Sequence, residues 1–153
     1  PPIHQNNFDV LFRRKEKIVC VTAENSVFLK GITAPTLPEL AECPLCLSTG
    51  CHLMMSKIFA EKSIRPQILS ICTTRTTALR WAEDDCGVSI VPMEPKEKLP
   101  EGLIAKAITG VDTDLYKTVV RVKGRPLSVV SKKFLQFYSD VRDSERMIKI
   151  KDL

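Results

Sequence analysis

The sequence predicts an α/β fold with a largely parallel sheet, because apolar strand-like runs alternate with helical segments along the chain. Two segments share one design, an apolar strand, a small polar turn and a helix: PLCLSTGCHLMMSKIFAEK and QILSICTTRTTALRWAED. A third apolar run, from Val88 to Val91, directly follows Gly87. In such folds ligands bind beyond the carboxyl ends of the strands, so both polar turns are expected to face one cleft.

The first part of the chain predicts two extended segments and a short helix. Residues 8–12 alternate in polarity and residues 17–23 are rich in β-branched side chains, which favours strands. A charged turn over residues 13–15 is expected between them, either within a hairpin or between two extended segments of one sheet. After a loop, Thr36 is expected to cap a short helix whose first turn tolerates Pro38.

The middle of the chain repeats the strand and helix pattern. A strand is expected over residues 44–47, and residues 52–62 form a helix by the spacing of Met55, Ile58 and Phe59. The next strand and helix are expected to span residues 68–72 and 76–85, with the strand over 88–91 stopped by Pro92. Further strands are expected over 103–108 and 115–122. A final helix is expected to start at Ser128 and to carry one apolar face: Val130, Phe134, Phe137 and Val141.

Composition indicates a folded protein without a membrane span. The chain has 153 residues, of which 44% are hydrophobic and 27% charged, so a packed core is expected. No apolar run reaches membrane-spanning length and no signal peptide is evident, which predicts a soluble cytoplasmic protein. The net charge of +5 comes from scattered residues, which favours a solvated basic surface over a nucleic-acid surface. Because the first residue is Pro1, the chain is expected to be a piece of a longer protein.

The turn from Thr73 to Thr77 is the first candidate ligand site. It places four hydroxyls and the Arg75 guanidinium where a helix begins, and free N–H groups at a helix start bind anions. Thr73, Thr74 and Arg75 are therefore candidate ligand-binding residues. Plain helix capping is the alternative, although it would occupy only one or two of the threonines.

The turn Ser48-Thr49-Gly50 is the second candidate ligand site. A hydroxyl and a glycine at a helix start allow a carboxylate to approach the backbone. Capping is an equally good explanation of Ser48, Thr49 and Gly50 taken alone.

The sequence contains no motif that predicts a metal site or a catalytic site. Cys43 and Cys46 have the spacing of a metal or redox pair, but residues three apart on a strand face opposite sides. The sequence has no nucleophile elbow, phosphate loop or dinucleotide fingerprint. We therefore expect no bound metal, no cofactor and no catalytic residue.

Residues 8–141 resemble the effector-binding domain of LysR-type transcriptional regulators. The resemblance rests on an ordered set of segments: KIVCVTAENSVFL, LPELAECPLCLSTG, CGVSIVP, LPEGLIAKAI and VVRVKGRPLSVVSKKFLQFYSDV. The acidic residues Glu83-Asp84-Asp85 depart from the family pattern, which has small residues and a glycine there. A solvated helix end is the favoured explanation of this departure.

The resemblance implies two Rossmann-like α/β subdomains similar to type II periplasmic binding proteins. Residues 24–117 would form the second subdomain, and residues 1–23 with 118–153 an incomplete first subdomain. The strands crossing between them would be residues 17–23 and 118–122. The family's N-terminal winged helix-turn-helix has no counterpart in this sequence.

The function implied by the resemblance is effector sensing rather than catalysis. A small anionic metabolite would bind between the subdomains, and the change would be relayed to a DNA-binding domain. The family implies dimers or tetramers of the full-length protein, DNA binding only through the winged helix-turn-helix, and no membrane partner. The alternative from another class is a small α/β enzyme that uses a cysteine nucleophile or a cysteine-bound metal.

Overall fold

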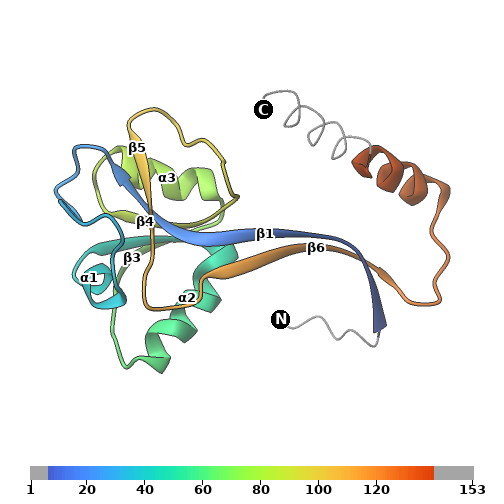
Figure 1. Cartoon of the computed structure of the whole chain (residues 1–153), viewed down its shortest axis with the longest axis horizontal. Coiled ribbons are helices and arrows are strands. Elements are labelled where there is room, and N and C mark those ends of the chain that lie inside the picture. The colour runs from blue at the N-terminus through green and yellow to red at the C-terminus, as the bar shows by residue number, and fades with distance from the viewer. Residues whose placement is uncertain (1–6, 140–153) are drawn as a thin grey trace. The chain divides into compact units, whose positions relative to one another are not determined.

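The computed structural model describes residues 7–139 and forms an α/β fold (Figure 1). The predicted class is therefore confirmed. The labelled elements, in chain order, are β1 (Phe8–Ala23), α1 (Leu37–Ala41), β2 (Pro44–Ser48), α2 (Thr49–Glu61), β3 (Gln67–Cys72), α3 (Arg75–Glu83), β4 (Val88–Met93), β5 (Leu103–Ala107) and β6 (Asp114–Val122).

The strands form one mixed sheet in the order β3-β2-β4-β1-β5, and β6 pairs with β1 outside this path. β2 pairs in parallel with β3 and β4, whereas β1 pairs antiparallel with β4 and β5. Among these five strands β1 alone therefore runs against the others, so the expected parallel pairing is limited to β3, β2 and β4. The carboxyl ends of β2, β3 and β4 lie at one edge of the sheet.

The backbone separates into two compact units whose boundaries lie inside strands. One unit contains residues 1–12 and 119–153, and the other contains residues 13–118. Residues 17–23, assigned from the sequence to the first subdomain, belong to the second unit because they pair with β4 and β5. The division into two functional subdomains stays a prediction.

The expected charged turn over residues 13–15 is wrong, because β1 is continuous through it. Two of its three charged side chains contact β6 instead. The Lys15 ammonium lies 2.5 Å from a carboxylate oxygen of Asp114, and the Arg13 guanidinium lies 3.7 Å from the centre of the Tyr116 ring. A charged run is thus compatible with a strand when a neighbouring strand supplies its partners.

Two clusters of buried side chains use alternate residues of β1. Ile18 and Cys20 belong to a cluster with α1 and α2, whereas Val21 belongs to a cluster with α3. This division follows from the geometry of a strand, in which successive side chains point to opposite faces. The helices therefore cover both faces of the sheet, as the alternation of elements in the sequence predicts.

Helices α2 and α3 begin earlier than the sequence indicated, at Thr49 and Arg75. The expected stop at Pro92 is also wrong, since β4 continues to Met93. Pro92 opposes Ile18 of β1, while the ladder between β2 and β4 ends at Ile90. Proline has no backbone N–H, and it is tolerated at position 92 because β4 has only β1 as a paired neighbour there.

The unit containing residues 119–139 includes the expected last helix, which runs from residue 129 to the end of the described chain. The Ser128 hydroxyl caps it by accepting a hydrogen bond from the N–H of Ser131 at 3.1 Å. Phe134 and Phe137 on this helix are exposed, with 57% and 68% of their surface accessible. Val141, expected on the same face, lies outside the described residues.

Within residues 7–139, no helix has both the length and the apolar character needed to cross a bilayer.

Candidate functional site

The structure brings the two predicted turns together at the carboxyl ends of β2 and β3. Ser48 opposes Cys72 in the parallel ladder, so the turns that follow these residues start side by side. The Thr49 hydroxyl then donates a hydrogen bond to the Thr73 carbonyl at 3.2 Å. Helices α2 and α3 consequently begin next to each other, with their N-termini at the same edge of the sheet.

The start of α2 keeps its backbone donors. Ser48 occupies the N-cap position but its side chain makes no capping hydrogen bond. The Ser48 hydroxyl is buried and lies 3.4 Å from the sulfur of Cys51. Thr49 and Gly50 are exposed in this first turn. Backbone N–H groups at such an uncapped start, together with the helix dipole, favour an anionic partner.

The start of α3 is capped by one of its threonines, so the threonines of this turn are not equivalent. The Thr74 hydroxyl accepts a hydrogen bond from the N–H of Thr77 at 3.1 Å and lies 2.9 Å from the Thr77 hydroxyl. Capping therefore accounts for Thr74. The Thr73 side chain is exposed, and its hydroxyl forms no hydrogen bond within residues 7–139. Thr73 and Thr76 are the members of this turn whose hydroxyls form no hydrogen bond among the described residues, and Thr73 directly follows the last residue of β3.

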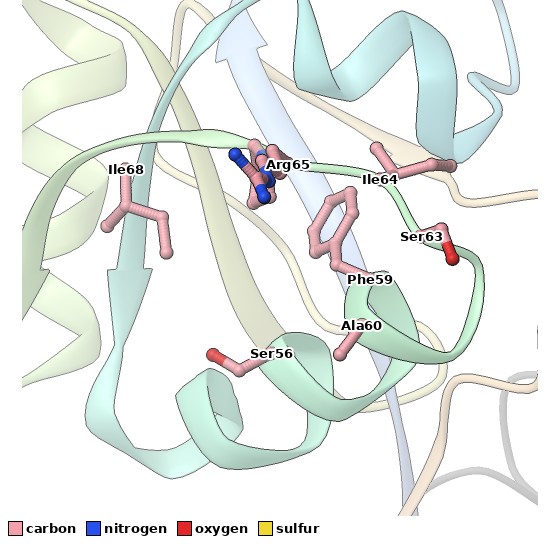
Figure 2. A pocket seen from close by; sticks show the side chains of 8 residues that line it. Ser56, Phe59, Ala60, Ser63, Ile64, Arg65 and Ile68 are labelled. Carbon is pink, nitrogen blue, oxygen red and sulfur yellow. The ribbon is translucent and has the colours of Figure 1, made fainter.

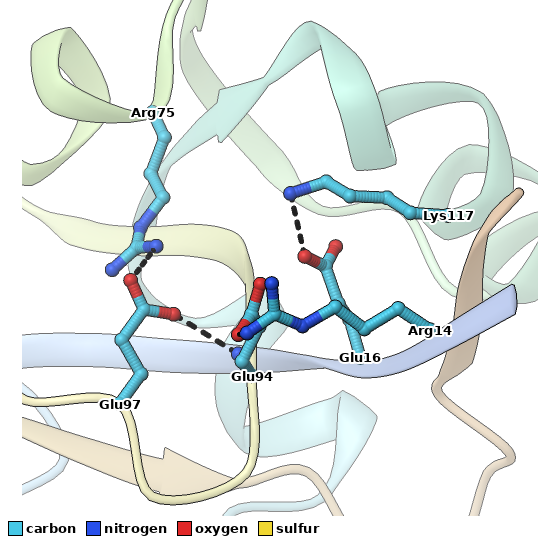
Figure 3. Close-up of polar contacts among 6 residues, drawn as sticks. All are labelled: Arg14, Glu16, Arg75, Glu94, Glu97 and Lys117. Atoms are coloured by element: carbon cyan, nitrogen blue, oxygen red, sulfur yellow. Dashed lines mark hydrogen bonds and ion pairs between the residues drawn. The ribbon is translucent and has the colours of Figure 1, made fainter. Parts of the chain in front are cut away.

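Arg75 is engaged by a carboxylate that the sequence did not reveal. Its guanidinium forms an ion pair with Glu97, in the loop after β4 (Figure 3). Burial works to raise the pKa of the Glu97 carboxyl, but hydrogen bonds from the Glu94 N–H and from Arg75 hold that pKa below its ordinary value. The Arg75 Nε atom is buried and has no acceptor among the described residues. Arg75 is therefore already paired with a carboxylate, and its Nε–H is a donor without an acceptor among the described residues.

A neutral charge cluster surrounds this pair (Figure 3). Glu16 on β1 is only 2% exposed and lies 2.6 Å from the Lys117 ammonium of β6. Arg14 pairs with Glu94, whose N–H also donates to Glu97 at 3.0 Å. The charge cluster comprises three cations and three carboxylates: Arg14, Arg75, Lys117, Glu16, Glu94 and Glu97. Because these side-chain charges cancel, an anion at this edge of the sheet would depend on backbone N–H groups and hydroxyls.

The three carboxylates of the charge cluster were missed by sequence reasoning. Glu97 is 22 residues from Arg75, and no periodicity connects them. The one available signal was Glu16, a carboxylate directly before the apolar run KIVCVTA. A charged residue at the edge of a buried strand requires a partner, but the sequence does not indicate which one.

A separate hollow of about 590 Å³ lies at the other end of β3 (Figure 2). It is lined by the last turns of α2 and the segment that leads into β3, including Phe59, Arg65 and Ile68. The predicted turn with Thr73 follows the opposite end of the same strand. This hollow is therefore not part of the candidate site.

The acidic end of α3 is more engaged than the sequence suggested. Asp85 adopts a positive φ of 49°, a conformation that favours glycine, and its carboxylate accepts a 2.5 Å hydrogen bond from the Ser26 hydroxyl. Glu83 pairs with Arg80 at 2.5 Å. The solvated helix end expected from sequence is thus wrong for Asp85, which holds the loop after β1.

Burial dominates the chemistry of the cysteines. It raises the pKa of the Cys20 thiol to about 12 and that of the Cys46 thiol to about 11. Burial likewise raises the pKa of Cys43 and of Cys51. Among residues 7–139, no three His, Cys, Asp or Glu side chains converge as ligands for a metal ion.

Comparison with known proteins gives matches at the level of structure. No family model matches the sequence, and no curated protein matches it. The effector-binding domain of QuiR, solved in complex with shikimate, has a TM-score of 0.69 at 23% identity over 88% of this chain and 65% of that chain. The regulatory domain of CcmR from Synechocystis PCC6803, solved with 2-PG, has a TM-score of 0.70 at 14% identity over 92% and 70%.

CbnR, a LysR family transcriptional regulator, is similar over a smaller part of its length. The full-length protein complexed with its target DNA has a TM-score of 0.67 at 18% identity, and the match covers 94% of this chain and 49% of that chain. This chain thus spans about half of the full-length regulator and less than two thirds of the QuiR domain. The sequence resemblance is confirmed at the level of architecture: the chain has the fold of the effector-binding domains of LysR-family transcriptional regulators.

Proposed function

We propose that this chain is the effector-sensing part of a LysR-type transcriptional regulator. In this proposal a small anionic metabolite binds at the carboxyl ends of β2 and β3, at the starts of α2 and α3. The observation that carries the proposal is the hydrogen bond from the Thr49 hydroxyl to the Thr73 carbonyl. It aligns one capped and one uncapped helix start at the edge of the sheet where α/β folds bind ligands.

Each candidate ligand-binding residue has a distinct role in this proposal. Thr49 and Gly50 would present the first-turn N–H groups of α2, and Thr73 would contribute its free hydroxyl. Arg75 would donate through the Nε–H that has no acceptor among the described residues. Ser48 and Thr74 would support the two helix starts, because the first is buried and the second is a cap.

Relay and assembly belong to the same proposal. The bound metabolite would shift the population of domain arrangements, which requires a different affinity for each arrangement. The regulator would act in the cytoplasm as a dimer or tetramer and would contact DNA through a winged helix-turn-helix domain. Similarity in fold to CbnR, solved with its target DNA, supports this extension.

A pair of threonine variants tests the site. We expect Thr73→Val to weaken metabolite binding about fivefold, since a lost hydrogen bond costs about 1 kcal/mol, with little change in thermal stability. We expect Thr74→Val to lower the free energy of unfolding by about 1 kcal/mol, because it removes the cap of α3. Thermal-shift screening with small carboxylates, shikimate and 2-PG included, would identify a ligand, and calorimetry would measure its affinity. Equal ligand affinity in Thr73→Val and the unmodified chain would contradict the site.

The alternative, a cysteine enzyme, makes a different prediction about thiol reactivity. Five of the six cysteines are buried and Cys86 is exposed. We expect Ellman's reagent to modify Cys86 in the native chain and the five buried thiols only after denaturation, because the reagent must reach the sulfur atom. A Cys86→Ser variant would identify the reactive residue. A second native thiol that reacts faster than free cysteine would favour the enzyme.

A further inference from the structure

A hollow of about 720 Å³ lies on the residue 13–118 unit, far from the candidate site along the strands. It is bounded by the end of β1, the middle of β5 and the loop of residues 24–33. Ala23 opposes Leu103, so the end of β1 lies beside the start of β5. Because β1 runs against the other strands, this hollow is at the amino ends of the parallel strands, whereas the two ligand turns follow their carboxyl ends.

A buried lysine lines this hollow without a carboxylate partner. Lys106 is only 8% exposed, and its ammonium donates one hydrogen bond, to the Leu29 carbonyl at 2.8 Å. Within residues 7–139 no Asp or Glu forms an ion pair with Lys106. An ammonium has three N–H donors, and a buried charge is costly unless it is paired. Lys106 thus has donors to spare for an anion in the hollow.

A second buried polar group lines the same hollow. Thr22 is 1% exposed, and its hydroxyl has no hydrogen-bond partner among the described residues. Thr22 opposes Ile104 and Cys20 opposes Lys106, so Thr22 and Lys106 are diagonal neighbours on one face of the antiparallel pair. Diagonal neighbours are within reach of one small ligand. A buried unpaired hydroxyl costs free energy, which a ligand oxygen would recover.

The remaining lining is apolar, neutral and polar (Asn25 and Thr33), or balanced in charge. Phe28, Ile32 and Ile104 supply hydrocarbon surface, and the acidic Glu24 offsets the basic Lys30. The Ser26 hydroxyl is already used, because it donates to Asp85 and accepts from the Phe28 N–H. The hollow therefore combines one surplus cation, one free hydroxyl and an apolar wall.

From these features we propose a second ligand site, which takes a small monocarboxylate with a short apolar body. One carboxylate oxygen accepts from the Lys106 ammonium, and an oxygen also bonds the Thr22 hydroxyl. The hydrocarbon part lies against Phe28 and Ile32. The site is independent of the proposed effector site, since the two share no residue.

Calorimetric titration of the chain with acetate, butyrate and hexanoate tests the proposal, with butanol and butylammonium as neutral and cationic controls. We expect saturable binding of butyrate or hexanoate and none of the controls. Lys106→Met should weaken binding about tenfold or more, and Thr22→Val about fivefold, as charged and neutral hydrogen bonds are lost. Lys57→Met, at an exposed position on α2, should retain full affinity.

Thr22→Val keeps the test decisive if Lys106→Met does not fold, since valine replaces a hydroxyl that has no partner with a methyl of similar size. Thr73→Val should leave carboxylate binding here unchanged, which separates this site from the effector site. Loss of binding in Thr22→Val but not in Thr73→Val supports the second site. Absence of saturable binding for all three carboxylates, or equal affinity in Thr22→Val and the unmodified chain, overturns it.

Discussion

Replacing Gly87 by alanine is expected to lower the free energy of unfolding by about 3 kcal/mol, because the new methyl group meets a backbone atom. A Cβ at Gly87 would lie 2.5 Å from the Pro44 carbonyl oxygen and 3.3 Å from its carbon. Pro44 begins β2, which pairs with β3 on one side and β4 on the other. The oxygen is a backbone atom and cannot rotate away as the end of a flexible side chain could. The strands themselves must therefore shift.

Gly50→Ala is the matched control for this substitution. A Cβ at Gly50 would meet only the Cγ atom of Pro92, at 4.0 Å. Since Gly50 lies in α2, alanine should be neutral or stabilise the chain by about 0.5 kcal/mol. Urea unfolding followed by circular dichroism would measure both changes. Equal unfolding midpoints for the two variants would show that the close approach of β2 to Gly87 is not a constraint.

Ile90→Ala is expected to destabilise the chain by about 2–5 kcal/mol, through lost burial and the cavity left behind. Ile90 is fully buried on β4, opposite Leu47 of β2 and Cys20 of β1. Its carbonyl accepts a hydrogen bond from the Cys51 sulfur at 3.1 Å, next to the start of α2. The variant therefore also tests whether the central strand supports the candidate site.

Ile68→Ala compares the same change at an edge position. Ile68 lies on β3, at the edge of the sheet, and is 40% exposed. We expect Ile68→Ala to lower the free energy of unfolding by about 1 kcal/mol or less, because truncating a partly exposed side chain leaves no enclosed cavity. Chemical denaturation of both variants gives the comparison. A cost for Ile68→Ala as large as that for Ile90→Ala would indicate that β3 is covered in solution.

Local patterns accounted for most elements of the fold. The helical spacing of Met55 and Phe59 correctly predicted a helix with a buried face, and Thr36 caps α1 as expected. The two polar turns were correctly placed after consecutive strands. These features depend on residues close in sequence, which is why periodicity and capping preferences reveal them.

Features that depend on distant residues were not predictable in the same way. The continuity of β1 through Arg13 and Lys15 depends on β6, about a hundred residues away in the chain. The engagement of Arg75 depends on Glu97. The sequence also could not distinguish Thr73 from Thr74, because both are threonines with the same capping preference and only the backbone conformation shows which one occupies the N-cap position.

The continuity of β1 has a consequence for dividing the protein into separately produced pieces. The boundaries between the two compact units lie between Phe12 and Arg13 and between Thr118 and Val119. Both boundaries lie inside strands, β1 and β6, that are hydrogen-bonded to each other. A cut at either position would leave unpaired backbone N–H and C=O groups at a newly exposed strand end. Such groups can pair with another chain and promote aggregation. Such a protein is better dissected by substitution than by truncation at the boundary of a compact unit.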